Sequence, residues 1–92
     1  MAQNARQIAQ QLERRIKMLI FVRGYVARHV NAPSVREIQE ALGYSSSSMV
    51  QADVRWWIQR GDLVRTGPQG RARSFTTQEA LRLIRGAFGE PA

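Results

Sequence analysis

Apolar residues recur at intervals of three and four between residues 5 and 29, which is the spacing of one face of an α-helix. The pattern predicts one long helix from about Ala5 to His29, with an apolar stripe towards the core and basic residues in solvent. The expected stripe consists of Ile8, Leu12, Ile16, Leu19, Ile20, Val22, Val26 and Val30. The basic residues expected in solvent are Arg14, Arg15, Lys17, Arg23 and Arg28.

This helix is unusually long for a small domain, and "NAP", residues 31–33, ends it because a residue before proline is pushed out of the α region. The part before about Arg15 is expected either to extend beyond the core, as an arm or a helix for a partner, or to be a frayed, solvated lead-in.

Two shorter amphipathic helices follow. Ser34 and Glu37 form the S-x-x-E capping box that begins a helix, and Gly43 supplies the left-handed residue that ends it. Another helix begins at one of the serines 46–48 and ends at Gly61. Its apolar positions are Val50, Val54, Trp57 and Ile58, with Trp57 expected in the core and Trp56 at its rim. Two such helices joined by a tight turn are typical of a helix-turn-helix, although any αα-hairpin shares the pattern.

The residues after Gly61 predict a β-hairpin and a further helix. Residues 62–66 and 72–76 are short extended segments around the turn cluster of residues 67–70, which contains two glycines. Thr76 and Glu79 form a second capping box before a helix with an apolar face. That face comprises Ala80, Leu81, Ile84, Ala87 and Phe88. The expected fold class is mainly α with a small β-hairpin: a single winged helix-turn-helix domain over residues 1–92, with a three-helix core, a wing and an additional C-terminal helix.

Composition narrows the function. The 92 residues carry a net charge of +7, and Lys17 is the only lysine. An arginine-rich chain of this kind favours an anionic partner such as a phosphate backbone. There is no cysteine and His29 is the only histidine, so neither a cofactor nor a metal is expected, and no catalytic pair of nucleophile and base is evident. The longest apolar run, residues 18–22, is too short for a membrane span, and a cytoplasmic, nucleoid-associated protein is expected.

The stretch "APSVREIQEALGYSSSSMVQADVRWWIQRGDLVR", residues 32–65, resembles the N-terminal DNA-binding domain of LexA-type repressors. The resemblance covers about residues 15–76, which leaves a helical extension over residues 1–14 and an extra helix over residues 77–89. The chain departs from the family at Ser48 and Gln51, where asparagine and glutamate are usual. The family's C-terminal self-cleaving protease is absent. The chain is therefore expected to be either an excised domain or a stand-alone regulator without autoproteolysis.

The resemblance implies that the early residues of the third helix enter the major groove, which places Ser46, Ser48, Met49, Gln51 and Ala52 towards the bases, and that Arg71 lies near the backbone. The residue types fit these roles. The serines allow the helix N-terminus to approach phosphate, Gln51 can pair with an adenine edge, and Met49 and Ala52 can meet a thymine methyl group. A flexible serine-rich link is the alternative for residues 45–48. The full predicted DNA-binding set is Ser34, Ser46, Ser47, Ser48, Met49, Gln51, Ala52, Arg55, Arg65, Arg71 and Arg73.

The sequence thus predicts a sequence-specific regulator of transcription that binds double-stranded DNA, acts as a repressor and forms a homodimer through its terminal helices, because two-fold operators demand a dimer. The alternative is a winged helix used for protein interaction, such as an adaptor on polymerase or a phage assembly, with Trp56 and the terminal helices as the contact surface. Basic residues on the third helix and the wing favour DNA binding over this alternative.

Overall fold

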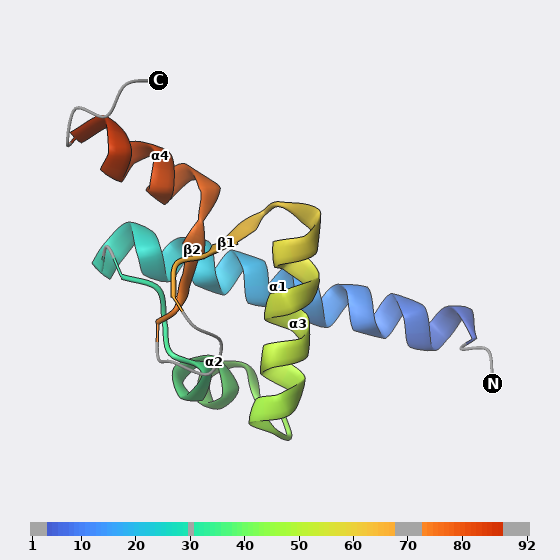
Figure 1. Cartoon of the computed structure of the whole chain (residues 1–92). Coiled ribbons are helices and arrows are strands. Elements are labelled where there is room, and N and C mark those ends of the chain that lie inside the picture. Colours follow the sequence, from blue (N-terminus) through green and yellow to red (C-terminus); the bar gives the residue numbers. More distant parts are fainter. Residues whose placement is uncertain (1–3, 30, 68–72, 88–92) are drawn as a thin grey trace.

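The computed structural model describes residues 4–29, 31–67 and 73–87. Within these ranges the fold is a winged helix-turn-helix with one further helix, and this confirms the predicted class (Figure 1). The elements in chain order are α1 (Ala5–His29), α2 (Val35–Leu42), α3 (Ser47–Arg60), β1 (Leu63–Arg65), β2 (Phe75–Thr77) and α4 (Gln78–Ala87).

The helix-turn-helix is set by local signals that the sequence displays. Ser34 caps α2: its hydroxyl accepts from the Glu37 backbone N–H at 3.1 Å, and the Glu37 carboxylate accepts from the Ser34 N–H at 3.0 Å. Gly43, at φ 72°, ends α2 in the left-handed conformation that favours glycine. Ser46 then caps α3 by accepting from the Met49 N–H at 3.2 Å, and Gly61, at φ 90°, ends that helix. The predicted bounds of α2 and α3 are confirmed.

The two strands form an antiparallel hairpin in which Leu63 pairs with Thr77 and Arg65 with Phe75. The predicted capping box at the start of α4 is wrong by one residue. Because Thr76 pairs with Val64 inside the ladder, the strand continues to Thr77, and the Thr77 hydroxyl accepts from the Ala80 N–H at 3.1 Å. The Thr76 hydroxyl is buried without a hydrogen-bond partner.

The core joins α1, the helix-turn-helix and the hairpin. Its members are Met18, Leu19, Val22, Val26, Ala32, Ile38, Tyr44, Val50, Val54, Trp57, Leu63 and Phe75. Trp57 therefore lies in the core, and Trp56 is half-buried at its rim, as predicted.

The predicted core stripe of α1 is only partly correct. Leu19, Val22 and Val26 are buried, and so is Met18, which the prediction omitted. Four predicted members are instead exposed: Ile8 by 45%, Leu12 by 40%, Ile16 by 50% and Ile20 by 64%. Four residues of an α-helix correspond to slightly more than one full turn. Side chains at i, i+4 spacing therefore rotate gradually around the helix, away from the face that packs against the core. Val30 lies outside the described residues.

The N-terminal end of α1 projects from the body. A 25-residue helix is about 38 Å long, whereas the two shorter dimensions of the molecule are 25 and 23 Å. Figure 1 shows α1 crossing α3 and continuing past it towards the N-terminus, with no other element alongside. Residues 4–10 are all exposed. We term residues 5–13 the arm.

Candidate nucleic-acid interface

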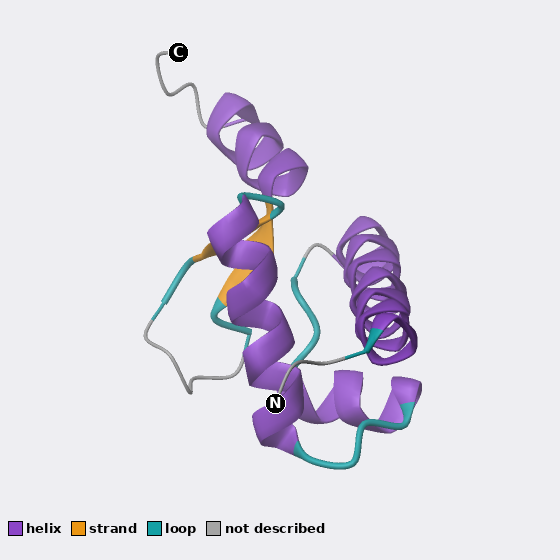
Figure 2. Cartoon of the chain, turned by 90° about the vertical axis from the view of Figure 1, so that its right-hand side faces the viewer, coloured by secondary structure: helices purple, strands orange, loops and turns teal. Residues whose placement is uncertain are grey.

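The outer face of α3 is exposed. α3 buries Val50, Asp53, Val54 and Trp57 on one side. Seen from the N-terminal end of α1, that helix lies to one side of α3, and no other helix covers the opposite side (Figure 2). The residues exposed along α3 are Ser47, Ser48, Ala52, Arg55, Gln59 and Arg60, with Gln51 half-exposed.

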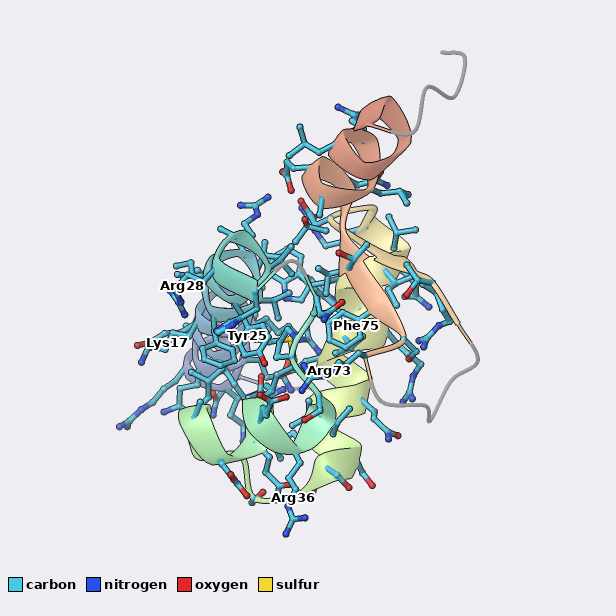
Figure 3. The ribbon with its side chains drawn as sticks, turned by 90° about the vertical axis from the view of Figure 1, so that its left-hand side faces the viewer. Lys17, Tyr25, Arg28, Arg36, Arg73 and Phe75 are labelled. Atoms are coloured by element: carbon cyan, nitrogen blue, oxygen red, sulfur yellow. The ribbon has the colours of Figure 1, made fainter. Side chains whose placement is uncertain are left out.

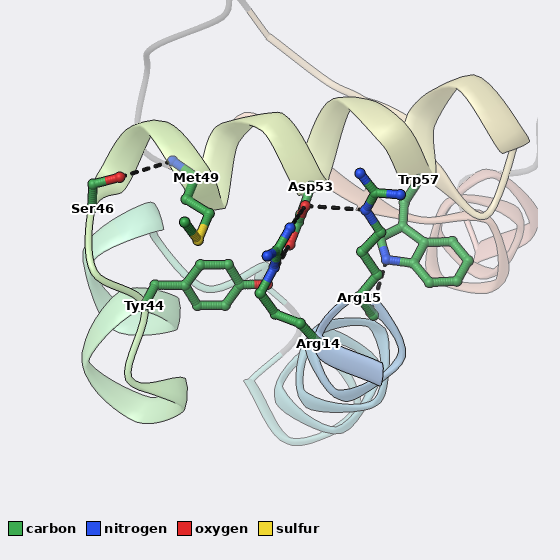
Figure 4. A network of polar contacts seen from close by, with 7 residues as sticks. All are labelled: Arg14, Arg15, Tyr44, Ser46, Met49, Asp53 and Trp57. Carbon is green, nitrogen blue, oxygen red and sulfur yellow. Dashed lines mark hydrogen bonds and ion pairs between the residues drawn. The ribbon is translucent and has the colours of Figure 1, made fainter. Parts of the chain in front are cut away.

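Most of the residues predicted for the third helix lie on or beside this face. Ser46 is the cap, and Ser47 and Ser48 form the first turn, where backbone N–H groups remain free to meet an anion. Gln59 continues the exposed line one turn beyond Arg55 and was missed, although its i+4 spacing could have revealed it. Met49 differs, because its side chain is half-buried and packs against the core beside Tyr44 (Figure 4). Ser34 caps α2, with its hydroxyl held by the Glu37 N–H.

The three arginines predicted for the wing have different surroundings. Arg65 is on β1 and half-exposed. Arg71 lies outside the described residues. Arg73, at φ 57°, turns its guanidinium back onto the protein. Of the two wing arginines that the structure describes, Arg73 is thus directed towards the protein, whereas Arg65 is half-exposed on β1.

Arg73 joins the end of the hairpin loop to α1 and α2. Its guanidinium donates to the Ala32 carbonyl at 2.6 Å and to the Tyr25 hydroxyl at 3.2 Å, and it approaches the Glu37 carboxylate at 2.7 Å. Figure 3 shows Tyr25 and Arg73 directed towards one another. The Tyr25 hydroxyl in turn donates to Glu37 at 2.8 Å. Because these partners occupy the guanidinium, Arg73 is better suited to holding the hairpin in place than to meeting phosphate.

The same contacts act on Glu37. The hydrogen bond from the Ser34 backbone N–H contributes most to stabilising the Glu37 carboxylate, and the hydrogen bond from the Tyr25 hydroxyl contributes next. The positive charge of Arg73 adds a smaller contribution. They lower the pKa of Glu37 from 4.5 to about 2. Glu37 therefore stays ionised well into the acid range.

A pH-dependent stability follows from that lowered pKa. The stabilisation by ionised Glu37 is fully present above the unfolded-state pKa of about 4.5, and it is lost as the pH falls from there towards 2. We expect Glu37→Gln to melt at a lower temperature than the wild type at pH 7, and the gap to narrow on acidification. Thermal melts of both proteins at several pH values between 7 and 2 test this; a gap that stays constant would contradict it.

A buried charge network, which the sequence analysis did not find, lies under α3. Asp53 is fully buried, and its carboxylate accepts from two arginines of α1: from Arg14 at 2.7 and 2.9 Å and from Arg15 at 3.2 Å. The Tyr44 hydroxyl donates to it at 2.7 Å (Figure 4). The expectation that Arg14 and Arg15 stay in solvent is therefore wrong: their side chains are 32% and 19% exposed, because they reach from α1 to this acid on α3.

Electrostatics in the network favour the ionised acid. Burial raises the pKa of Asp53, but the hydrogen bonds from Arg14, Tyr44 and Arg15 outweigh burial and hold that pKa below its ordinary value. Burial, reinforced by the carboxylate, raises the pKa of the Tyr44 hydroxyl. The only acidic side chain on α3 is thus withdrawn from the outer face and neutralised by two cations, which leaves that face without a negative charge.

Trp56 also contacts other residues of the domain. Its ring meets Trp57 edge-on at 4.8 Å, and the guanidinium groups of Arg15 and Arg60 lie 4.5 and 5.0 Å from its centroid. These are cation–π distances, so the ring is held between two charges. Trp56 therefore has partners within the chain, as expected for a residue that packs at the rim.

A comparison with known protein families identifies the family of this chain. The family model described as the LexA DNA binding domain matches residues 9–73, well over half of the chain. The chain belongs to the LexA DNA-binding domain family. No curated protein and no solved structure gives a significant match. The match spans the crossing of α1 and α3, the helix-turn-helix and β1, so the suspected LexA-type resemblance is confirmed.

As a LexA-type domain, the chain is a DNA-binding domain of a family that is not catalytic. In residues 4–29, 31–67 and 73–87, no helix is both long and apolar enough to cross a membrane. The same part of the chain holds no group of three potential metal ligands among its histidines and acids. The exposed face of α3, with the hairpin beside it, is the candidate surface for DNA.

Proposed function

We propose that this protein is a sequence-specific regulator of transcription that reads the major groove of double-stranded DNA with α3 and represses by occluding a promoter. The observation that carries the proposal is the uncovered face of α3 in a LexA-type domain with a net charge of +7. The major groove of DNA is wide enough to admit an α-helix, and the many arginines of the chain attract the phosphates.

Each part of the face has a distinct chemical role in the proposal. The free N–H groups of the first turn, beside Ser47 and Ser48, suit a phosphate oxygen. Gln51 can donate to and accept from an adenine edge, and Ala52 can contact a thymine methyl group. Arg55 and Arg65 approach the phosphates on either side. Ser34, Met49 and Arg73 have structural partners and take supporting positions, and Arg71 remains a phosphate contact on the strength of the resemblance alone.

The test is selection of bound sites from random duplex DNA by the whole chain. Enrichment of one motif supports sequence-specific reading, and the symmetry of that motif defines the half-site. Recovery of random sequences alone would overturn the proposal of sequence specificity. The protein would then bind DNA only through electrostatic attraction to phosphate. Occlusion is then tested by placing the motif over a promoter and measuring transcription in vitro.

Mutating a residue that contacts a base and mutating a residue that contacts phosphate should have different effects on DNA binding. We expect Gln51→Ala to cost roughly 1–3 kcal/mol on the selected site and little on scrambled duplex, because a base contact is lost. Arg65→Ala should weaken binding to both duplexes alike and lower the salt slope by about one unit, since a phosphate contact carries no sequence information. Titrations on both duplexes at several salt concentrations measure these effects.

The matched control is Arg28→Ala, which removes an equal charge from the exposed C-terminal end of α1. It should change the salt slope less than Arg65→Ala. If Gln51→Ala lowers affinity equally on selected and scrambled DNA, α3 is not the reading element.

The second candidate function is a winged helix that binds another protein. It is favoured by the exposed apolar residues on α1, whereas the internal partners of Trp56 remove that residue from the expected contact surface. Absence of any duplex binding at low salt, together with retained folding, would make this candidate the better account.

A further inference from the structure

The buried carboxylate of Asp53 joins three parts of the fold at one point. Asp53 itself belongs to α3, and its oxygens accept from Arg14 and Arg15 of α1. They also accept from Tyr44, which lies in the turn between α2 and α3. Figure 4 shows the three donor side chains converging on the acid. Asp53 has no exposed surface, so these donors, rather than solvent, satisfy its two oxygens.

A buried ion pair of this kind adds little net stability. Removing both charges from water costs about as much as their attraction returns, and an apolar pair of similar volume is often equally stable. The ion pair differs from an apolar pair in its directionality. Hydrogen bonds between ionised groups require a short distance and an aligned donor, whereas apolar contacts have no preferred direction. A buried ionic contact is therefore suited to fixing one arrangement of two helices among several of similar energy.

The contacts of Asp53 restrict the rotation of α3 against α1. Arg14 binds the carboxylate with two nitrogens: Nε lies 2.7 Å from one oxygen and Nη2 lies 2.9 Å from the other, which fixes the plane of the carboxylate. Arg15 Nε adds a further contact at 3.2 Å. The hydrogen bond from Trp57 to α1 lies one turn farther along α3, away from the residues proposed to contact bases. Asp53 is therefore the directional contact nearest to those residues.

The residues proposed to face DNA are close to Asp53 in the chain. Gln51 and Ala52 directly precede it and Arg55 follows two residues later, so a rotation of α3 about its axis moves all of them. At a side-chain radius of about 5–6 Å, a rotation of about 10° moves an outer atom by about 1 Å. Base contacts tolerate less, since donor–acceptor distances in hydrogen bonds span only about 0.5 Å. The rotation that Asp53 fixes on the inner face therefore decides where the outer face places its side chains.

We propose that Asp53 is a positioning residue: through its contacts with α1 and the turn, it sets the sequence specificity of α3 without touching DNA. The inference rests on the proposed reading of the major groove by α3, and it adds a residue on the opposite side of that helix. Attraction to phosphate does not require one exact rotation of the helix. Loosening the network should therefore lower specificity and leave nonspecific affinity unchanged.

A charge-neutral replacement of the ion pair tests this inference. Asp53→Leu with Arg14→Met removes one negative and one positive charge, so the net charge stays at +7 while an apolar contact replaces the directional one. Affinities of the wild type and the variant are measured on the motif selected by the wild type and on scrambled duplex. We expect the ratio of these two affinities to fall roughly tenfold, as on loss of a base contact, while the affinity for scrambled duplex stays within about twofold.

Two further variants separate positioning from a general loss of stability. Arg14→Lys keeps the charge but replaces the planar fork by a single ammonium group, so it should lower the ratio by a smaller factor. The matched control is Glu13→Gln with Lys17→Gln, which removes an exposed ion pair of α1 and also leaves the net charge at +7. This control should keep the wild-type ratio. Circular dichroism and urea melts establish that each variant is folded under the conditions of the binding assay.

Failure of this inference is distinguishable from failure of the proposed function. If the folded apolar variant keeps the wild-type ratio, or if Arg14→Lys keeps it where the apolar variant does not fold, the inference is overturned. An equal fall in affinity on both duplexes also overturns it, because binding is then lost without a change in specificity, and so does a control that loses the ratio as strongly. In these cases the wild type still prefers its selected motif, so the proposed function stands. If the wild type shows no preference, both are overturned.

Discussion

Asp53→Ala is expected to lower the free energy of unfolding by about 3–5 kcal/mol, because removing one member of a buried ion pair leaves its partners without compensation. Arg14 and Arg15 would remain on α1 without the carboxylate that accepts from them, and the Tyr44 hydroxyl would lose the carboxylate to which it donates. The loss also weakens the contact between α1 and α3, which would then be joined mainly by the hydrogen bond from the Trp57 Nε1–H to the Arg15 carbonyl. Urea melts monitored by tryptophan fluorescence measure the effect.

The control is Asp62→Ala. Asp62 is a half-exposed acid just after α3, whose nearest arginine nitrogens are 3.9 Å away, so its removal should change stability by no more than about 0.5 kcal/mol. Similar losses for the two variants would mean that the buried network contributes no more than a surface pair. A further comparison replaces Asp53 by leucine and Arg14 by methionine together. It should be clearly more stable than Asp53→Ala, because an apolar pair of similar volume leaves only Arg15 and Tyr44 unpartnered.

The helix-turn-helix was predictable because its signals are local. A serine cap with its glutamate three residues later, and a glycine at each helix end, act within a few residues and fix the bounds of α2 and α3. The capping box of α4 failed for the opposite reason. Whether Thr76 or Thr77 caps that helix depends on how far β2 stays paired with β1, and this pairing joins residues more than ten positions apart.

The surroundings of the site could not be predicted from spacing. Asp53 meets Arg14 across 39 residues of sequence, and Arg73 meets Tyr25 across 48. An acid at position 53 beside Val54 reads as an ordinary polar residue until the position of α1 is known. The position of α1 is itself set by packing, and periodicity alone assigned its exposed apolar residues to the core. The one available signal was the spacing of Asp53, three residues after Val50 and four before Trp57, which places an acid that requires a partner on the apolar face of α3.

The prediction for the two tryptophans tests the rotational phase of α3, on which the outer face depends. Trp57 is 7% exposed, packs in the core and donates its Nε1–H to the Arg15 carbonyl at 2.9 Å. Trp57→Ala should therefore cost about 3–5 kcal/mol in the free energy of unfolding. Trp56→Ala should cost clearly less, because that side chain is only half-buried at the rim of the core, where Arg15 and Arg60 lie over its ring.

Denaturant melts of both variants, followed by circular dichroism because each loses a fluorophore, measure this difference. The residues that face DNA in the proposal lie on the side of α3 opposite Trp57, so the position of Trp57 fixes theirs. Equal losses for the two variants would place α3 in a different rotation, with Trp56 sharing the core and with Gln51 and Arg55 turned away from the groove. A large loss confined to Trp57→Ala keeps Ser48, Ala52, Arg55 and Gln59 on the open side.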